Sequence, residues 1–102
     1  MLKRIYEIVL DSPIGLKKGS LTLSGEGGAC AADIYLMRHW NRFAARRTGP
    51  GGYSLRGALW TQVGEVACEM ELRVEGEGLS AVADTAKGRM ELTGRLAENS
   101  EN

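Results

Sequence analysis

One stretch of the sequence, residues 65–75, constrains the fold more than any other. Successive side chains of a strand point to opposite faces, whereas a helix repeats every ~3.6 residues. A helix would therefore scatter the charges of this stretch around its circumference, and we predict a strand with one buried face and one solvated acidic face. The apolar row is Val66, Cys68, Met70, Leu72 and Val74, and the opposite row is Glu65, Ala67, Glu69, Glu71, Arg73 and Glu75.

Turn signals recur about every ten residues along the chain, a rhythm typical of β-barrels and β-sandwiches. The chain holds 14 glycines and 2 prolines, and glycine is the main residue of these turns. The segments between the turns are rich in β-branched, aromatic or alternating apolar residues. Further strands are expected over residues 3–11, 18–24, 53–60, 79–84 and 89–95.

The two halves of the chain repeat one another in colinear order, with a period of about 49–51 residues. Residues 10–15 match residues 59–64, residues 24–27 match residues 75–78, Ala32-Asp33 matches Ala83-Asp84, and Phe43 falls where Leu92 falls.

The repeat bears on residues 29–47, which are compatible with two structures. They could form a helix over residues 33–47 that carries Ile34, Met37, Trp40 and Ala44 on one face. They could instead form a hairpin that turns at Arg38-His39. The second copy, residues 78–95, alternates like two strands, so the hairpin is favoured.

Two units of four strands predict an all-β fold: a closed eight-stranded antiparallel up-and-down barrel, with a β-sandwich as the alternative. The single domain is expected over residues 1–97, with repeat units of about 2–48 and 52–96, followed by a flexible tail at 98–102. The inward side chains are expected to be Tyr6, Ile8, Leu10, Leu21, Leu23, Ile34, Leu36, Phe43, Leu55, Leu59, Met70, Leu72, Leu79, Met90 and Leu92. Gly19, Gly57, Ala81 and Ala83 are small inward residues that leave room for a ligand or let the strands coil tightly.

The repeat resembles a family of small bacterial duplicated β-barrels, whose units read like TPMG, a glycine, Thr-Leu-Thr-Leu and a Gly-containing turn. Ser12-Pro13-Ile14-Gly15 and Gly19-Ser20-Leu21-Thr22-Leu23 match the first unit well, and Thr61-Gln62-Val63-Gly64 matches the second loosely. The resemblance implies a fold and brings no catalytic residue with it, and the function of the family is unsettled. Residues 37–43 are more basic and aromatic than the family pattern.

Composition narrows the functional classes. Lysine plus arginine equals aspartate plus glutamate, 13 each, so no global field steers the protein toward nucleic acid or an anionic membrane. Cys30 and Cys68 belong to no CxxC motif and are expected to be buried free thiols. No apolar run approaches the ~18 residues of a membrane span, and residues 1–10 are too short and too polar for a signal peptide. We expect a cytoplasmic protein without a membrane partner.

Catalytic and metal chemistry find little support in the sequence. His39 is the only histidine and is expected in an exposed turn without a water-excluded pocket. The cysteines and His39 lack metal-ligand spacing, and residues 25–28 lack the lysine and the strand-to-helix context of a phosphate loop. Next-but-one glutamates on the acidic strand lie at glycosidase spacing, yet such a charge row is typical of a solvated face. We therefore expect no enzyme, no metal and no cofactor.

The expected function is that of a non-catalytic binding barrel, for a small apolar ligand or a protein partner. The alternative is single-stranded nucleic-acid binding, which the net charge makes the weaker expectation. That alternative uses the basic aromatic strand, through Arg38, Trp40, Arg42, Arg46 and Arg47.

A homodimer is expected through an outward patch of Tyr35, Met37, Trp40, Arg42 and Trp60, because aromatic residues, Met and Arg are enriched in interfaces. The pairing behind this patch sets Trp40 against Trp60, Met37 against Trp40, Tyr35 against Arg42 and, with a turn at Val63-Gly64, Ala67 against Trp60. A register slip of one residue would instead bury both tryptophans in the core.

Overall fold

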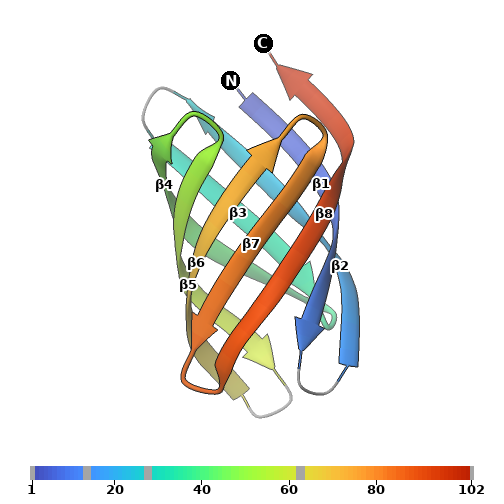
Figure 1. Cartoon of the computed structure of the whole chain (residues 1–102), viewed down its shortest axis with the longest axis vertical. Helices are drawn as coiled ribbons and strands as arrows, with labels where there is room; N and C mark the ends of the chain where they lie inside the picture. Colours follow the sequence, from blue (N-terminus) through green and yellow to red (C-terminus); the bar gives the residue numbers. More distant parts are fainter. Residues whose placement is uncertain (1, 13–14, 27–28, 62–63, 102) are drawn as a thin grey trace.

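Eight antiparallel strands make up this protein in a computed structural model that describes residues 2–12, 15–26, 29–61 and 64–101 (Figure 1). The strands are β1 (Leu2–Ser12), β2 (Gly15–Glu26), β3 (Ala29–Leu36), β4 (His39–Gly49), β5 (Gly52–Thr61), β6 (Gly64–Glu75), β7 (Gly78–Thr85) and β8 (Gly88–Glu101). Each strand pairs with its neighbours in the sequence, and β1 pairs with β8 to close the barrel. The predicted closed up-and-down barrel is confirmed, and both the sandwich and a helix over residues 33–47 are wrong.

The barrel is an elongated cylinder with extents of 39 × 22 × 21 Å. Both chain ends lie at one end of it, beside the β4–β5 and β6–β7 turns (Figure 1). The opposite end carries the β1–β2, β3–β4, β5–β6 and β7–β8 hairpins, and we refer to it as the distal end.

The core fills the barrel interior because every strand alternates inward apolar residues with outward polar ones. All of the predicted inward side chains are buried except Met90, which is half-buried and packs against the core. Ala32, Tyr53 and Cys68 complete the buried set together with Ala81 and Ala83.

The end of the chain differs from the prediction of a tail. Residues 98–101 belong to β8 and pair with β1, from Ile5 opposite Glu98 to Leu2 opposite Glu101. The register shifts by one residue between Ile5 and Tyr6, so β8 carries a bulge there and continues beyond it. These last residues of β8 extend the sheet along the side of β1 that does not pair with β2.

Three of the four distal hairpins share one turn design. The Ser12 hydroxyl donates to the Gly15 carbonyl at 2.6 Å, Thr61 to Gly64 at 2.7 Å, and Thr85 to Gly88 at 2.9 Å. The three glycines have φ values of 115°, 101° and 120°, which glycine adopts readily. Ser12 and Gly15 are the predicted repeat partners of Thr61 and Gly64, and these matched pairs share the hydroxyl-to-carbonyl hydrogen bond and the positive φ of the glycine.

Candidate functional site

The fourth distal hairpin, between β3 and β4, departs from this turn design and carries most of the exposed aromatic side chains. Trp40 on β4 is 64% exposed and Trp60 on β5 is 42% exposed. The Trp40 ring lies 5.0 Å from the Tyr35 ring, and the His39 ring meets the Trp60 ring edge-on at 5.3 Å, both measured between centroids. We refer to Tyr35, His39, Trp40 and Trp60 as the aromatic face. The alternative register that buries both tryptophans is wrong.

Two predicted turns were displaced by one residue, and the strand pairings shift accordingly. The β3–β4 turn is at Met37-Arg38 rather than Arg38-His39, so Tyr35 lies opposite Trp40, not opposite Arg42. Met37 is a turn residue and does not pair with Trp40. When a two-residue turn moves by one residue, the cross-strand partner of each residue changes by two positions. Because side chains alternate with a period of two, each residue still points to the same side of the sheet.

The second displaced turn joins β5 and β6. Trp60 lies opposite Glu65, and Ala67 lies opposite Ala58 rather than opposite Trp60. Thr61 pairs with Gly64, so the connecting residues are 62 and 63, which lie outside the described residues. The predicted outward orientation of Trp60 nevertheless holds, because the face of each residue is unchanged.

Asn41 holds the strands of the aromatic face together. It is the buried polar residue of the described chain, at 6% exposure. Its Oδ1 accepts a hydrogen bond from the Trp60 backbone N–H at 2.9 Å, and its Nδ2 donates to the carbonyls of Ile34 at 3.1 Å and His39 at 3.2 Å. The β4–β5 backbone pairing runs from Ala44 to Gly49, so beyond it this amide connects the two strands. This role was not predicted from the sequence, although an Asn at an inward strand position could have indicated it.

The β3–β4 turn stores backbone strain. Met37 has φ 51° and Arg38 has φ 67°, and they are the non-glycine residues with positive φ in the described chain. A type I′ turn needs this conformation at both central residues, and Asn-Gly is its preferred sequence. Strained backbone of this kind gathers at functional sites, and here it adjoins the aromatic face.

Arginines border the aromatic face. Arg42 on β4 binds Asp33 on β3 through two hydrogen bonds, Nε to Oδ1 at 2.9 Å and a second guanidinium nitrogen to Oδ2 at 3.0 Å. These hydrogen bonds, with the attraction of the carboxylate, raise the pKa of Arg42 above its ordinary value. Arg38 is exposed in the turn of the same hairpin, whereas Arg46 and Arg47 lie near the other end of β4, about 20 Å along the strand from Trp40. The structure therefore brings Arg38 and Arg42 beside the aromatic face and does not bring Arg46 and Arg47 there.

An open depression lies beside Trp40 on the outer wall. It has a volume of about 590 Å³ and is lined by Trp40, Asp33, Thr22, Ile5, Lys3 and Ser24, from β1 to β4. The indole forms one wall, and a cation and a carboxylate stand among apolar and hydroxyl groups. The aromatic face is therefore next to a concave surface on the outer wall.

Neighbouring atoms occupy the space beside two of the small inward residues, Gly57 and Gly19. A Cβ added at Gly57 would lie 2.9 Å from the Phe43 ring, and one added at Gly19 would lie 1.9 Å from the Tyr35 carbonyl oxygen. These glycines therefore allow close approach of a ring and of a backbone, and they do not leave open volume.

Other chemical groups of the described residues stand apart from the aromatic face. No group of three or more His, Cys, Asp or Glu residues among them could hold a metal ion, and they include no helix long and apolar enough to cross a membrane. Cys30 and Cys68 are both free thiols, and Cys68 is buried as predicted, whereas Cys30 is only half-buried. Burial, with Asp84 and Glu69 nearby, raises the pKa of the Cys68 thiol to about 11, so it stays protonated at neutral pH.

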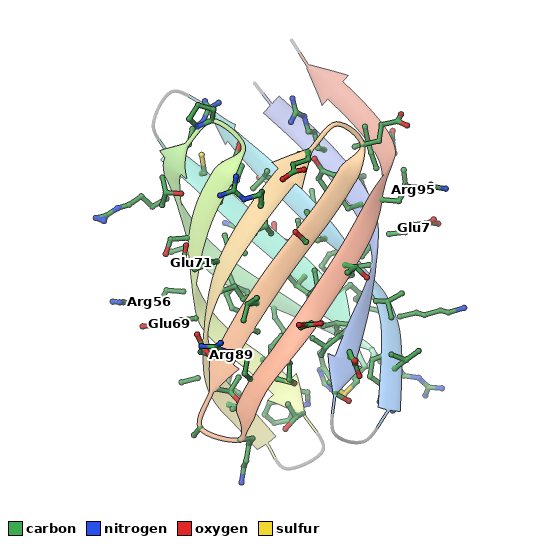
Figure 2. All side chains as sticks on the ribbon, in the orientation of Figure 1. Glu7, Arg56, Glu69, Glu71, Arg89 and Arg95 are labelled. Atoms are coloured by element: carbon green, nitrogen blue, oxygen red, sulfur yellow. The ribbon has the colours of Figure 1, made fainter. Side chains whose placement is uncertain are left out.

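The acidic strand β6 takes part in a row of charges across the outer wall. Arg56 on β5 pairs with Glu69 on β6 at 3.1 Å, and Arg89 on β8 pairs with Asp84 on β7 at 3.0 Å. Glu69 and Asp84 lie opposite each other in the register, so each carboxylate has its own arginine. All four side chains are well exposed, as expected for a solvated face (Figure 2).

Positive and negative residues are concentrated on different parts of the barrel, although the net charge of the whole chain is zero. Residues 12–61, which include β2 to β5, hold seven Lys and Arg against two Asp and Glu, a net of +5. Residues 62–102, which include β6 to β8, hold four against nine, a net of −5. Counting charge by half-chain could have found this from the sequence. The basic half and the acidic half meet at the β5–β6 pairing.

Comparisons with protein-family models, with curated proteins and with solved structures give no match for this chain.

Proposed function

We propose that this barrel is a non-catalytic binding protein that recognises a protein partner through the aromatic face and its bordering arginines. The observation that carries the proposal is the distal end itself. Three hairpins there share a hydrogen bond from a Ser or Thr hydroxyl to the carbonyl of a glycine with positive φ. The fourth hairpin instead has a strained Met37-Arg38 turn beside two exposed tryptophans. Monomeric proteins seldom expose such a patch without a use for it.

The construction of the patch also supports recognition. Its rings are mounted on strands of a closed barrel, and Asn41 fixes the spacing between two of those strands. Rigid aromatic side chains lose little conformational entropy on binding, which is why Trp and Tyr dominate interface hot spots. The depression beside Trp40 offers a socket for a side chain of the partner.

A protein partner is favoured over a small apolar ligand inside the barrel. The Phe43 ring occupies the space that a side chain at Gly57 would fill, and the Tyr35 backbone occupies the space beside Gly19. Neither position therefore leaves room for a ligand. An eight-stranded barrel has an interior that side chains just fill or that holds one small ligand, and these two close approaches favour the filled interior. The depression beside Trp40 lies on the outer wall rather than inside the barrel.

Single-stranded nucleic acid is the second candidate. Exposed indole rings beside Arg38, in a half-barrel with a net charge of +5, combine a stacking surface with a basic one. Arg46 and Arg47 lie farther along β4, toward its other end. Arg42 contributes less, because its guanidinium is already paired with Asp33.

The test is photo-crosslinking in living cells of the source organism. A photoreactive amino acid replaces Trp40, and in a matched control it replaces Thr93, which is exposed on β8 across the barrel. We expect a discrete protein adduct from position 40 and none from position 93. No adduct from position 40, or the same adducts from both positions, would contradict the proposal.

The nucleic-acid candidate has its own readout. Binding of a single-stranded oligonucleotide would quench the fluorescence of Trp40 and Trp60, and its affinity would fall steeply with salt concentration. A protein without such quenching at low salt is not a single-strand binder.

A further inference from the structure

We propose that the partner of the aromatic face is a second copy of this chain, which joins the first about a twofold axis along the β5–β6 pairing. This inference rests on the proposed function and names the partner of the same surface. The chain carries both the basic surface and its acidic complement, so a second copy supplies the matching charge.

An isologous dimer uses the same patch on both copies, so the patch must contain both members of every complementary pair. The β5–β6 pairing meets this condition. Basic side chains of β4 and β5 lie on one side of it, and acidic side chains of β6 lie on the other. Exposed arginines on one side include Arg42, Arg46 and Arg56, and exposed glutamates on the other include Glu65, Glu69 and Glu71. β6 also carries one exposed arginine, Arg73, opposite Gly52.

A rotation of 180° about an axis parallel to the strands would bring the basic side of one copy over the acidic side of the other. Each copy then places β4 and β5 over β6 and β7 of the other. By the register, Arg56 lies level with Glu69 of the other copy, and Arg46 lies level with Glu71. Arg56 of each copy faces Glu69 of the other, in addition to the 3.1 Å pair within each copy. Figure 2 shows these two residues on one side of the barrel, with Arg95 on the opposite side.

The shape of the surface at the axis fits close approach. Ala58 and Ala67 lie opposite each other in the register, and both are outward residues with small side chains. Trp60 lies on the same strand as Ala58, opposite Glu65, so the aromatic face begins where the small residues end. Two such surfaces can bring their backbones together at the alanines and enclose the indole rings at the distal end.

The charge arrangement yields a pairing test. In the Arg56→Glu variant, the new glutamate of each copy faces Glu69 of the other copy. In the Glu69→Arg variant, the new arginine of each copy faces Arg56 of the other copy. Each variant alone should dimerise at least about tenfold more weakly than the native protein, because like charges face each other twice. A mixture of the two variants should form a heterodimer, because every contact again joins opposite charges.

Sedimentation velocity measures these states for the full chain. We expect the native protein to be a dimer that dissociates as salt rises, and the two single variants to be monomers that associate when mixed. Arg95→Glu on β8 makes the same charge change away from the axis and should leave the dimer intact. Both Arg56 and Glu69 are exposed, so circular dichroism should show an unchanged fold.

Several outcomes would overturn the homodimer. They are a monomeric native protein, single variants that dimerise normally, a mixture that stays monomeric, and growth into open chains. If position 40 crosslinks to a different protein while the native chain is monomeric, the homodimer fails and protein recognition stands. If position 40 crosslinks to no protein, both fail.

Discussion

The side-chain Oδ1 of Asn41 accepts a 2.9 Å hydrogen bond from the backbone N–H of Trp60, beyond the point where β4 and β5 pair through their backbones. The same amide donates to the Ile34 carbonyl on β3. One buried side chain therefore links three strands under the aromatic face. A buried amide that satisfies its partners in this way stabilises the fold, and removal leaves those partners unpaired.

Asn41→Leu should lower the free energy of unfolding by about 2 kcal/mol, because it keeps the side-chain volume and abandons the Trp60 N–H in a buried setting. Urea denaturation measures the loss. Amide hydrogen exchange provides a local readout, and the Trp60 amide should exchange faster while the Leu72 amide in β6 keeps its protection. An unchanged Trp60 exchange rate would show that this N–H has another partner.

Substitution of a barrel-wall glycine by alanine should reduce the free energy of unfolding by an amount that depends on the space around that glycine. Gly19→Ala drives a Cβ to 1.9 Å from a backbone oxygen and should cost about 3 kcal/mol or more, while Gly57→Ala presses on the Phe43 ring and should cost less, about 1–3 kcal/mol. Gly49→Ala is the matched control, because an added Cβ there has nothing within 4 Å and the φ angle is not positive. Equal effects at all three positions in thermal unfolding would refute a tightly filled wall.

The β3–β4 turn should be improvable. Met37→Asn with Arg38→Gly supplies the preferred type I′ sequence and should raise the free energy of unfolding by about 1–2 kcal/mol. Ala86→Asn with Lys87→Gly in the β7–β8 hairpin is the control. It should give no comparable gain, because neither residue there has a positive φ. A loss of stability in the first variant would mean that Met37 or Arg38 contributes contacts that outweigh the strain.

Alternation predicted the fold and the inward or outward orientation of side chains, because a strand permits only those two orientations. Both errors in turn position preserved that parity, so Trp40 and Trp60 were placed outward although their partners were wrong. The turn between Leu36 and His39 could not be located from the sequence, since Met37-Arg38 lacks the glycine that marks the other distal hairpins.

The bridging role of Asn41 and the charge segregation depend on the closed barrel, which brings distant segments of the chain together. Asn41 and Trp60 are 19 residues apart, and their hydrogen bond forms where backbone pairing has stopped. The end of β8 likewise depends on β1 at the other end of the sequence. Local patterns do not contain these relationships, so the expected tail at 98–102 missed the final pairs of β8. The common origin of the two repeat units stays a prediction.

The Cys68 thiol should make the protein less stable at alkaline pH. Its pKa in the folded state is about 11, above its ordinary value of 9.0, so the folded protein holds this proton more tightly than the unfolded chain. The contribution to stability is fully present below pH 9 and is lost as the pH rises through about 11. Cys68→Ala should flatten the pH dependence of urea denaturation in this window. A thiol reagent at neutral pH should modify Cys68 only after unfolding, and rapid native modification would contradict its burial.

The Tyr6 hydroxyl offers a direct test of what the barrel interior holds. Tyr6 is fully buried, and its hydroxyl is a buried side-chain polar atom without a hydrogen-bond partner in the described part of the chain. If the interior is filled by protein side chains alone, Tyr6→Phe removes an unsatisfied polar group and should leave stability unchanged or raise it by about 1 kcal/mol. Tyr53→Phe is the matched control at a second buried tyrosine, whose hydroxyl is not in this unpartnered group. Thermal unfolding of protein purified from its source organism provides the comparison. A loss of stability in Tyr6→Phe alone would show that the hydroxyl binds a water or a ligand inside the barrel, and would revive the small-ligand function.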